Sequence, residues 1–201
     1  VFLIELDVYP DFRGFFIESY QKEKFKAAGI DYPFVQDNHS HSIQGALRGL
    51  HYQLRHPQGK LIRVTNGKIF DVAVDLRRSS ETFGKWFGCF LSDENKKMMF
   101  IPPGFAHGYY AISEAVDVLY KTTDYYDPES ERCVLWDDLA LAIDWPLVSG
   151  KTPLLSKRDL AGKTLQEAVV LILRIILLQL EGQDLSVQIS SAICRILNLK
   201  P

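Results

Sequence analysis

The sequence is poor in cysteine and has almost no excess of charge of one sign. Its 201 residues include three cysteines, Cys89, Cys133 and Cys194, an odd number without paired spacing. This count argues against a secreted disulfide framework, so we expect a reducing, cytoplasmic compartment. The formal net charge is −2, so no overall basic field attracts nucleic acid, and we expect no nucleic-acid partner.

Four further features are missing from the sequence. The first residues, VFLIELDVYPDFRG, have no basic segment ahead of an apolar core, so we expect no signal peptide. Residues 168–178 are apolar except for Arg174, but a bilayer span takes roughly 20 apolar residues, so we expect no membrane role. A Gly-rich phosphate loop and a Ser/His/Asp or Cys/His signature are also absent from the sequence.

What the chain does contain is a series of short, strand-like runs separated by polar turns. KLIRVTNGKIFDVAVDL consists of two alternating runs joined by Asn66-Gly67, a dipeptide typical of hairpins. In the second run, one face carries Phe70, Val72, Val74 and Leu76, and the other carries Ile69, Asp71, Ala73 and Asp75. Many short antiparallel strands predict a mainly β fold of the sandwich, jelly-roll or small-barrel type.

Helices are predicted only near the two ends. SYQKEKFKAAGI reads as one short helix, with Ser19 as N-cap and Gly29 as its stop. We expect one domain over residues 1–163 and an apolar, helical extension of unknown role over 164–201, in which Thr164 and Glu167 form a capping box. Packing of this extension on the body or on a partner subunit is the simplest interpretation, and a sequence-frame error is the main alternative.

The stretch ALRGLHYQLRHPQGKLIRV, residues 46–64, places polar groups in strands. A lone strand histidine is more often structural than catalytic, but a lysine facing the same cavity would give His51 an electrostatic partner for a developing anion, and Lys60 is close in sequence. Strict alternation puts Arg48 and His51 on opposite faces, and a bulge at Gly49 would turn both towards one pocket.

Metal binding is not favoured by the histidine spacing. His51-Tyr52-Gln53 lacks the second histidine of a His-x-His pair, and His107 is a distant second nitrogen without a paired carboxylate. We therefore expect no metal and no cofactor. His39 and His41 do have His-x-His spacing, but they sit in a polar stretch, where we expect solvated loop residues.

Three other clusters could carry chemistry, and each also has a structural interpretation. In DFRGFFIESY, Arg13 beside a glycine could hold a phosphate or belong to a charged turn. In FVQDNHS, Gln36 and Asn38 could read the edge of a base or form a turn. In VLYKTTDYY, Tyr120 could donate a proton or lie bonded in the core, and Tyr126 could stack on a planar ring or be a surface aromatic.

Six segments together resemble one family. They read DFRGFFIESY, FVQDNHSHSIQGALRGLHYQ, PQGKLIRVTNGKIFDVAVDLR, FIPPGFAHGYYAIS, YKTTDYYDPESE and WDDLALAIDWPL, with a weaker match at LLSKRDLAGKTL. In this order they are similar to the dTDP-4-dehydrorhamnose 3,5-epimerase family of the cupin superfamily. The resemblance implies a metal-free, dimeric jelly-roll enzyme. It would invert C3 and C5 of dTDP-4-dehydro-6-deoxyglucose to give dTDP-4-dehydro-L-rhamnose, a precursor of L-rhamnose and of lipopolysaccharide O-antigens.

The resemblance also implies residue roles. His51 would be the base, Lys60 would stabilise the enolate oxygen and Tyr120 would reprotonate from the opposite face, while Asp159 would partner the base. Arg13 and Arg48 would clamp the diphosphate, and Tyr126 would stack on thymine. The residues expected to bind substrate are Arg13, Phe16, Glu18, Gln36, Asn38, Arg48, Gln53, His107, Tyr126, Glu131 and Arg158.

The sequence departs from the family at three points. Arg158 stands where the family usually has a lysine, the family's first strand is cut short at Val1, and the apolar tail from Ala168 has no counterpart. Three alternatives stay open: an epimerase acting at one carbon or on a related keto sugar, a metal-dependent cupin enzyme, and a non-catalytic sugar-nucleotide binding module.

Overall fold

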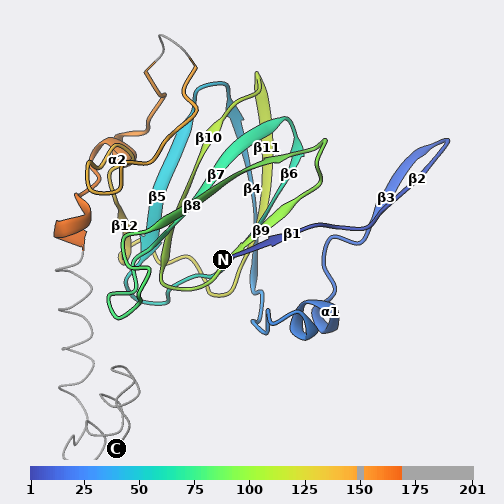
Figure 1. The fold of residues 1–201 in the computed structure, drawn as a ribbon, viewed down its shortest axis with the longest axis horizontal. Coiled ribbons are helices and arrows are strands. Elements are labelled where there is room, and N and C mark those ends of the chain that lie inside the picture. Colours follow the sequence, from blue (N-terminus) through green and yellow to red (C-terminus); the bar gives the residue numbers. More distant parts are fainter. Residues whose placement is uncertain (149–151, 169–201) are drawn as a thin grey trace, which may run out of the picture.

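The computed structural model describes residues 1–148 and 152–168, which form two five-stranded antiparallel sheets and a two-stranded ribbon (Figure 1). The first sheet, in the order β1-β9-β6-β11-β4, contains β1 (Phe2–Ile4), β4 (Gln36–Ile43), β6 (Lys60–Asn66), β9 (Met98–Ile101) and β11 (Ala115–Thr122). The second sheet, in the order β12-β5-β10-β7-β8, contains β5 (Leu47–Gln53), β7 (Lys68–Asp75), β8 (Trp86–Ser92), β10 (Phe105–Ala111) and β12 (Glu131–Cys133). The ribbon pairs β2 (Val8–Asp11) with β3 (Gly14–Ile17), and the two short helices are α1 (Lys22–Ala27) and α2 (Lys157–Leu160). The predicted mainly β, jelly-roll class is confirmed.

Strand β7 shows why the two sheets pack as they do. Phe70, Val72 and Val74 belong to a core that covers the outer face of the second sheet, together with Trp145 from the later chain. The alternate residues Ile69 and Ala73 belong to a second core between the sheets. The predicted two faces of this run are therefore correct, and both are buried, because further chain covers the outer one.

The prediction of a hairpin at Asn66-Gly67 is wrong. Gly67 does form a turn with φ +76, but β6 belongs to the first sheet and β7 to the second. A Cβ at Gly67 would lie 2.3 Å from the carbonyl oxygen of Ala115, so a glycine is required where the chain passes this close to its neighbour. The dipeptide signals the turn but not the partner strand.

Helix α1 begins later than predicted. Its N-cap is Gln21, whose side-chain Oε1 accepts a 2.6 Å hydrogen bond from the Lys24 amide, and Ser19 lies outside the helix. The ring of Tyr20 packs edge-on against Phe25, with ring centroids 5.0 Å apart. This contact joins the residue before the cap to the fourth helical residue, which is the arrangement of a hydrophobic staple and sets where the helix starts.

Residues 36–43 form a strand, so the predicted loop at His39 and His41 is wrong, although both side chains are exposed to solvent as predicted. The strand, β4, pairs with β11 along its whole length. Both histidines face outward, where His39 Nε2 and His41 Nδ1 lie 2.9 and 3.0 Å from Asp117 Oδ1. The inward face is also polar, which hid the alternation on which strand prediction depends.

The chain after β12 covers the second sheet. Ser156 and Asp159 form a capping box at α2. The predicted box of Thr164 and Glu167 is confirmed, because the Thr164 amide donates to Glu167 Oε2 and the Glu167 amide donates to Thr164 Oγ1. Ala168 is buried in the outer core. The rest of the predicted 164–201 extension lies outside the described residues, and none of the described helices is long and apolar enough to cross a membrane.

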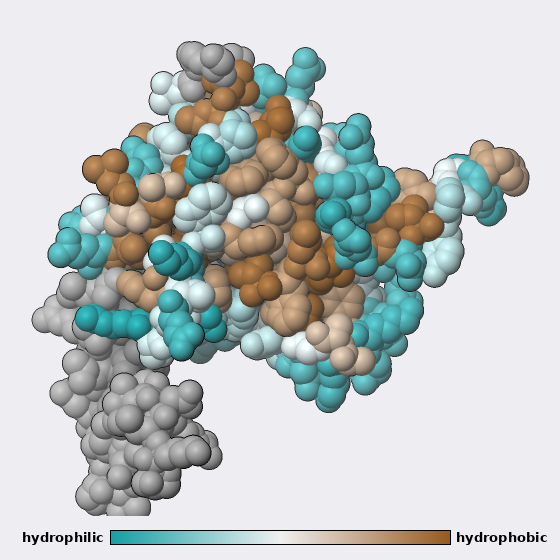
Figure 2. All heavy atoms as spheres, viewed as in Figure 1, coloured by the Kyte–Doolittle hydropathy of each residue, from teal (hydrophilic) through white to brown (hydrophobic). Residues whose placement is uncertain are grey.

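The ribbon of β2 and β3 projects away from the body (Figure 1). Figure 2 shows apolar surface, in brown, that continues from the body along the chain leading to this ribbon. The exposed aromatic residues of the ribbon and its tip include Tyr9, Phe12, Phe15 and Phe16. A ribbon of two strands is not stable by itself in water, so this surface is suited to packing on another surface.

Candidate active site

A cavity of about 340 Å³ opens between the two sheets. Strands from both sheets contribute polar side chains to it, which is unusual for the inside of a small sandwich. The lining residues are Gln36, Asn38, Ser40, Arg48, His51, Gln58, Lys60, His107, Tyr109, Tyr120, Tyr126, Glu131 and Arg158. Most of the residues singled out in the sequence therefore meet in one place.

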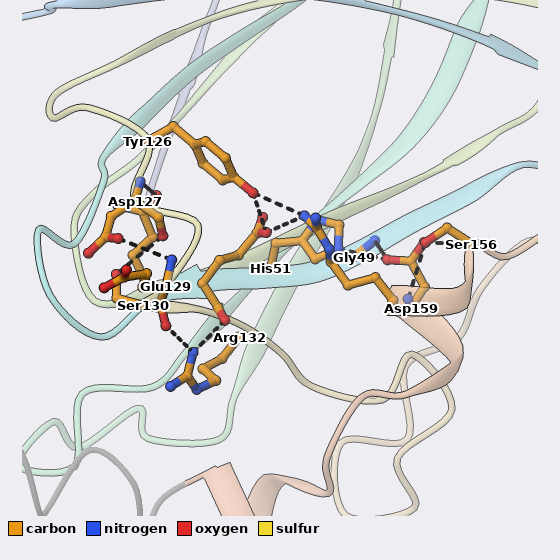
Figure 3. Close-up of polar contacts among 12 residues, drawn as sticks. Gly49, His51, Tyr126, Asp127, Glu129, Ser130, Arg132, Ser156 and Asp159 are labelled. Atoms are coloured by element: carbon orange, nitrogen blue, oxygen red, sulfur yellow. Dashed lines mark hydrogen bonds and ion pairs between the residues drawn. The ribbon is translucent and has the colours of Figure 1, made fainter.

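His51 is held by a carboxylate from the far end of the chain. Its Nε2 lies 2.7 Å from Asp159 Oδ1, and the same carboxylate accepts hydrogen bonds from the Gly49 amide (3.2 Å) and the Ser156 hydroxyl (2.6 Å). Figure 3 shows the Asp159 carboxylate between Ser156 and the strand that carries Gly49 and His51. Burial alone would raise the pKa of Asp159, but the hydrogen bonds from His51 and Ser156 lower it to about 2. The ionised carboxylate accepts a hydrogen bond from the Nε2–H group, so Nε2 carries the proton of the neutral ring. Nδ1 is therefore the nitrogen that can take up a further proton.

The irregularity predicted at Gly49 is present. The pairing of β5 with β10 shifts register beside it, and Gly49 has φ +121. A Cβ there would lie 2.5 Å from the Cα of Gly108, so the two strands approach at a distance that only glycine permits. As a result Arg48 and His51 both line the cavity, and the Arg48 guanidinium donates to Ser42 Oγ and to the His41 carbonyl, each at 2.9 Å.

Lys60 faces the same cavity from β6. Burial lowers its pKa to about 8, although the carboxylates of Glu131 and Asp71 oppose that change. At neutral pH the ammonium is thus still the main form, in a setting poorly shielded by water. Such a cation is well suited to stabilise an oxyanion that forms in the cavity.

His107 forms a second buried pair. Its Nε2 lies 2.7 Å from Asp71 Oδ1, and burial lowers the pKa of His107 despite the neighbouring carboxylate. The other oxygen of this carboxylate, Asp71 Oδ2, is buried and makes no hydrogen bond to the described residues. The pair fixes the ring of His107 on the cavity wall.

Tyr120 enters the cavity from β11, the neighbour of β6. It packs against the core between the sheets, and burial raises the pKa of its phenol, with Tyr109 adding to the effect. A phenol with a raised pKa stays protonated at neutral pH and can donate a proton to a strongly basic carbon.

Tyr126, Glu131 and Arg158 form a polar cluster at the cavity rim. The Tyr126 hydroxyl donates to Glu131 Oε2 at 2.8 Å and accepts from the Arg158 guanidinium at 3.2 Å. Arg158 also forms an ion pair with Glu131. Figure 3 shows the Tyr126 side chain pointing towards His51. The cluster combines a ring that can stack with a cation that can bind an anion.

Gln53 was predicted to bind substrate, but its side chain is buried away from the cavity. Its amide nitrogen donates to the carbonyls of His56 (2.8 Å) and Tyr125 (3.2 Å), and its oxygen accepts from the Asp127 amide at 3.0 Å. With these groups already bonded, Gln53 serves to hold the loop that carries Tyr126. These bonds depend on tertiary contacts that the sequence pattern does not contain.

Arg13, Phe16 and Glu18 do not line this chain's cavity. Arg13 pairs with Asp11 on the projecting ribbon, with 2.6 Å between Arg13 Nη2 and Asp11 Oδ2. Glu18 pairs with Lys24 at the start of α1, and Phe16 is exposed on β3. Their predicted role in substrate binding therefore requires a second copy of the chain and stays a prediction.

Four residues of the site were not predicted. Ser40, Gln58 and Tyr109 line the cavity, and Asp71 holds His107. Tyr109 lies two residues after His107 on one strand, so alternation placed it on the same face. For Asp71, the signal in the sequence was a charged residue within an otherwise apolar run.

One group of side chains next to the cavity has the donor atoms of a metal site. A ring nitrogen of His51, the Sγ of Cys133 and a carboxylate oxygen of Asp159 lie within 4.8 Å of one another. No sequence motif indicates this group, because Cys133 meets the other two residues only through strand pairing and the fold of the later chain.

Comparisons with known proteins agree on one family. The family model described as dTDP-4-dehydrorhamnose 3,5-epimerase matches residues 1–167. A dTDP-4-dehydrorhamnose 3,5-epimerase from Pseudomonas aeruginosa is 57% identical, over 84% of this chain and 92% of the relative. The structure of a dTDP-6-deoxy-D-glucose-3,5-epimerase from Legionella pneumophila in complex with dTDP-4-keto-L-rhamnose aligns with a TM-score of 0.79 at 53% identity, covering 82% of this chain and 87% of that chain. A 3′-monoepimerase from Streptomyces bikiniensis, solved with dTDP-quinovose, aligns with a TM-score of 0.77 at 33% identity, covering 84% of this chain and 86% of that chain.

Proposed function

The chain belongs to the dTDP-4-dehydrorhamnose 3,5-epimerase family, and on this premise we propose how its cavity inverts C3 and C5 of dTDP-4-dehydro-6-deoxyglucose. The chain is an isomerase of dTDP-L-rhamnose biosynthesis. The observation that carries the proposal is the hydrogen bond between His51 and Asp159 at the wall of a cavity that Lys60 and Tyr120 also line. One base, one cation and one acid are the groups that epimerisation beside a ketone requires.

The reaction at each carbon takes two proton transfers. His51 Nδ1 removes the proton from C5 or C3, and the electron pair of the C–H bond moves into the enolate, whose oxygen is the former C4 ketone oxygen. The Lys60 ammonium stabilises that oxygen, and Asp159 stabilises the imidazolium. Tyr120 then donates its proton to the opposite face of the carbon, which inverts it. Solvent restores the proton on Tyr120 and removes the proton from His51 before the second carbon reacts.

The nucleotide occupies the polar rim in this proposal. Arg48 and Arg158 bind the diphosphate, because one guanidinium group can donate two parallel hydrogen bonds to phosphate oxygens. Tyr126 stacks on thymine, and Gln36 and Asn38 bond its edge. Glu131 orients Tyr126 and Arg158 through the rim contacts described above, and His107 lines the sugar pocket.

The projecting ribbon supports a homodimer. Its exposed aromatic residues and Arg13 lie outside this chain's cavity, and apolar surface leads to them from the body (Figure 2). We place Arg13, Phe16 and Glu18 at the cavity of a second copy, where Arg13 contacts the diphosphate. The compartment that fits this biosynthetic role and the cysteine usage is the cytoplasm.

Mixed dimers test the shared site. Homodimers of the Arg13→Ala chain and homodimers of the His51→Ala chain should both be inactive. When the two chains are co-expressed, each mixed dimer contains one site in which both residues are intact, so activity should return. A mixture of Lys60→Ala and His51→Ala chains is the matched control, because both residues belong to the same cavity and no intact site forms. Absence of complementation in the first mixture would contradict the shared site and leave the chemistry at His51 untouched.

A single-carbon epimerase is the second candidate, because the Streptomyces bikiniensis 3′-monoepimerase has a similar structure. Base, cation and acid serve either reaction. Incubating the chain with dTDP-4-dehydro-6-deoxyglucose and assigning the products by NMR separates them. The proposal predicts a product of L-rhamnose configuration, and a product inverted only at C3 would support the second candidate.

A further inference from the structure

Cys133 lies beside the proposed base, on the neighbouring strand. Strand β12 pairs with β5 so that Cys133 is opposite His51, and the thiol is buried, with a weak 3.4 Å contact to the carbonyl oxygen of Val134. Its Sγ lies within 4.8 Å of both a His51 ring nitrogen and an Asp159 oxygen. Epimerisation as proposed uses His51 and Asp159 but gives the thiol no role.

We propose that His51, Cys133 and Asp159 form an inhibitory site for a zinc-type divalent ion. One imidazole nitrogen, one thiolate sulfur and one carboxylate oxygen are the donors that zinc takes in proteins. Binding of the ion releases the Cys133 thiol proton to solvent. The resulting thiolate and the carboxylate together carry two negative charges, which match the charge of the ion. Water from the cavity fills the fourth position, because His51 lines that cavity.

The ligand atoms need to move only a little. Zinc–ligand distances of about 2.0–2.3 Å put tetrahedral ligand atoms about 3.3–3.6 Å apart. The three donor atoms already lie within 4.8 Å of one another, and the contact of 2.7 Å between His51 and Asp159 has to open. The Asp159 carboxylate keeps its orientation throughout, because Ser156 holds the other oxygen, Oδ2.

Occupation of this site stops proton transfer. The ion takes His51 Nε2 and the Asp159 oxygen that bonds it, so the proton of the neutral ring moves to Nδ1, the nitrogen that otherwise accepts the substrate proton. The ion also places a positive charge beside the ring. His51 then cannot accept a proton from the substrate. Magnesium prefers six oxygen ligands in octahedral geometry, so it is not expected to bind here.

Cobalt(II) tests the site independently of activity. It occupies zinc sites, and a thiolate ligand produces a charge-transfer band in the near ultraviolet. The full chain should bind one equivalent with this band. Cys133→Ala should lose the band, and so should Cys133→Val, whose larger side chain fills more of the space left by the thiol. Cys89→Ala and Cys194→Ala should keep the band. A wild-type chain without the band, or a Cys133→Ala chain that retains it, would overturn the site.

Zinc titrations of activity test the consequence. Zinc should inhibit the wild-type chain, EDTA should reverse this, and magnesium at the same concentration should have no effect. Cys133→Ala should keep the wild-type rate without metal and need at least about tenfold more zinc for half-inhibition; equal sensitivity would overturn the proposal. The inhibitory effect rests on the proposed function: a cobalt band without zinc inhibition would keep the metal site but contradict His51 as the base.

Discussion

His51 Nε2 and Asp159 Oδ1 lie 2.7 Å apart, although 108 residues separate them in the chain. The contact joins strand β5 to the capping box of α2, where Asp159 also bonds Ser156. One carboxylate thus helps to start a helix and orients a ring at the cavity wall. Loss of either contact affects the other, so the later chain is part of the site as well as a cover for the second sheet.

Asp159→Asn should lower kcat by about 10²–10⁴-fold with little change in KM, because the neutral amide neither fixes the tautomer of His51 nor stabilises the imidazolium. Steady-state kinetics measure this. Asp138→Asn is the matched control, since Asp138 is a buried carboxylate that bonds the backbone of Ala140 and Leu165, away from His51. It should lower stability and leave kcat near the wild-type value. An Asp159→Asn enzyme with wild-type kcat would remove Asp159 from the mechanism.

The pH profile should report Lys60. Burial lowers the pKa of its ammonium to about 8, so the cation is present below that pH and is lost as the pH rises through it. We expect kcat/KM to fall about tenfold per pH unit above pH 8. In Lys60→Arg the guanidinium stays charged, so the rate should be lower at neutral pH but lack this alkaline decrease. An unchanged decrease in Lys60→Arg would assign it to another group.

Gly49→Ala should destabilise the fold and abolish activity. The new Cβ would meet backbone atoms, the Gly108 Cα at 2.5 Å and the His107 carbonyl oxygen at 2.6 Å, at a residue with φ +121. Strain and overpacking together suggest a loss of about 3 kcal/mol or more in the free energy of unfolding. Gly45→Ala is the control: its φ is +85, but the nearest atom is 3.9 Å away, so it should cost only the strain, about 1–2 kcal/mol. Urea unfolding of both variants checks the difference, and equal losses would contradict the close approach.

Asp75 should make stability depend on acid. Burial by itself raises the pKa of this carboxyl, but hydrogen bonds from Arg77, Thr82 and Ser80 outweigh it and hold the pKa well below its usual range. The folded chain therefore favours the ionised form. Its stabilisation is fully present above the unfolded-state pKa near 3.9 and is lost as the pH falls towards the folded-state value.

Urea unfolding at several pH values tests this dependence. Asp75→Asn should lower the free energy of unfolding by about 3 kcal/mol at pH 7, and the gap from wild type should narrow below about pH 4. Asp11→Asn is the matched control, because Asp11 and Arg13 have the same spacing but lie exposed; it should change stability little at any pH. A gap for Asp75→Asn that is equal at pH 3 and pH 7 would contradict the assignment.

The β class and the two faces of β7 could be predicted from the sequence, because period-two alternation is a local property of the chain. The partner of β7 could not. Asn66-Gly67 sets a turn, but whether β6 pairs with β7 or crosses to the other sheet depends on what covers both faces of β7. Strand β4 was missed for a related reason: its inward face lines a polar cavity, so it lacks the apolar half of the pattern.

The site residues also differ in whether the sequence could predict them. Residue type and the family resemblance brought out His51, Lys60 and Tyr120, and the structure places all three on one cavity. The bonding of Gln53 to loop backbone and of Asp71 to His107 depends on strand register and loop closure, which no local pattern contains. The predicted role of the ribbon residues depends on a second copy of the chain, and no local sequence pattern specifies how two copies would meet.

In the proposed reaction, protons exchange at both carbons beside the ketone, with His51 as the base. The most direct measurement is NMR or mass analysis of dTDP-4-dehydro-6-deoxyglucose incubated with the chain in deuterated water. We expect deuterium at C3 and C5 with wild type, deuterium without inversion with Tyr120→Phe, and none with His51→Ala. Deuterium at a single carbon with wild type, or undiminished exchange with His51→Ala, would contradict it.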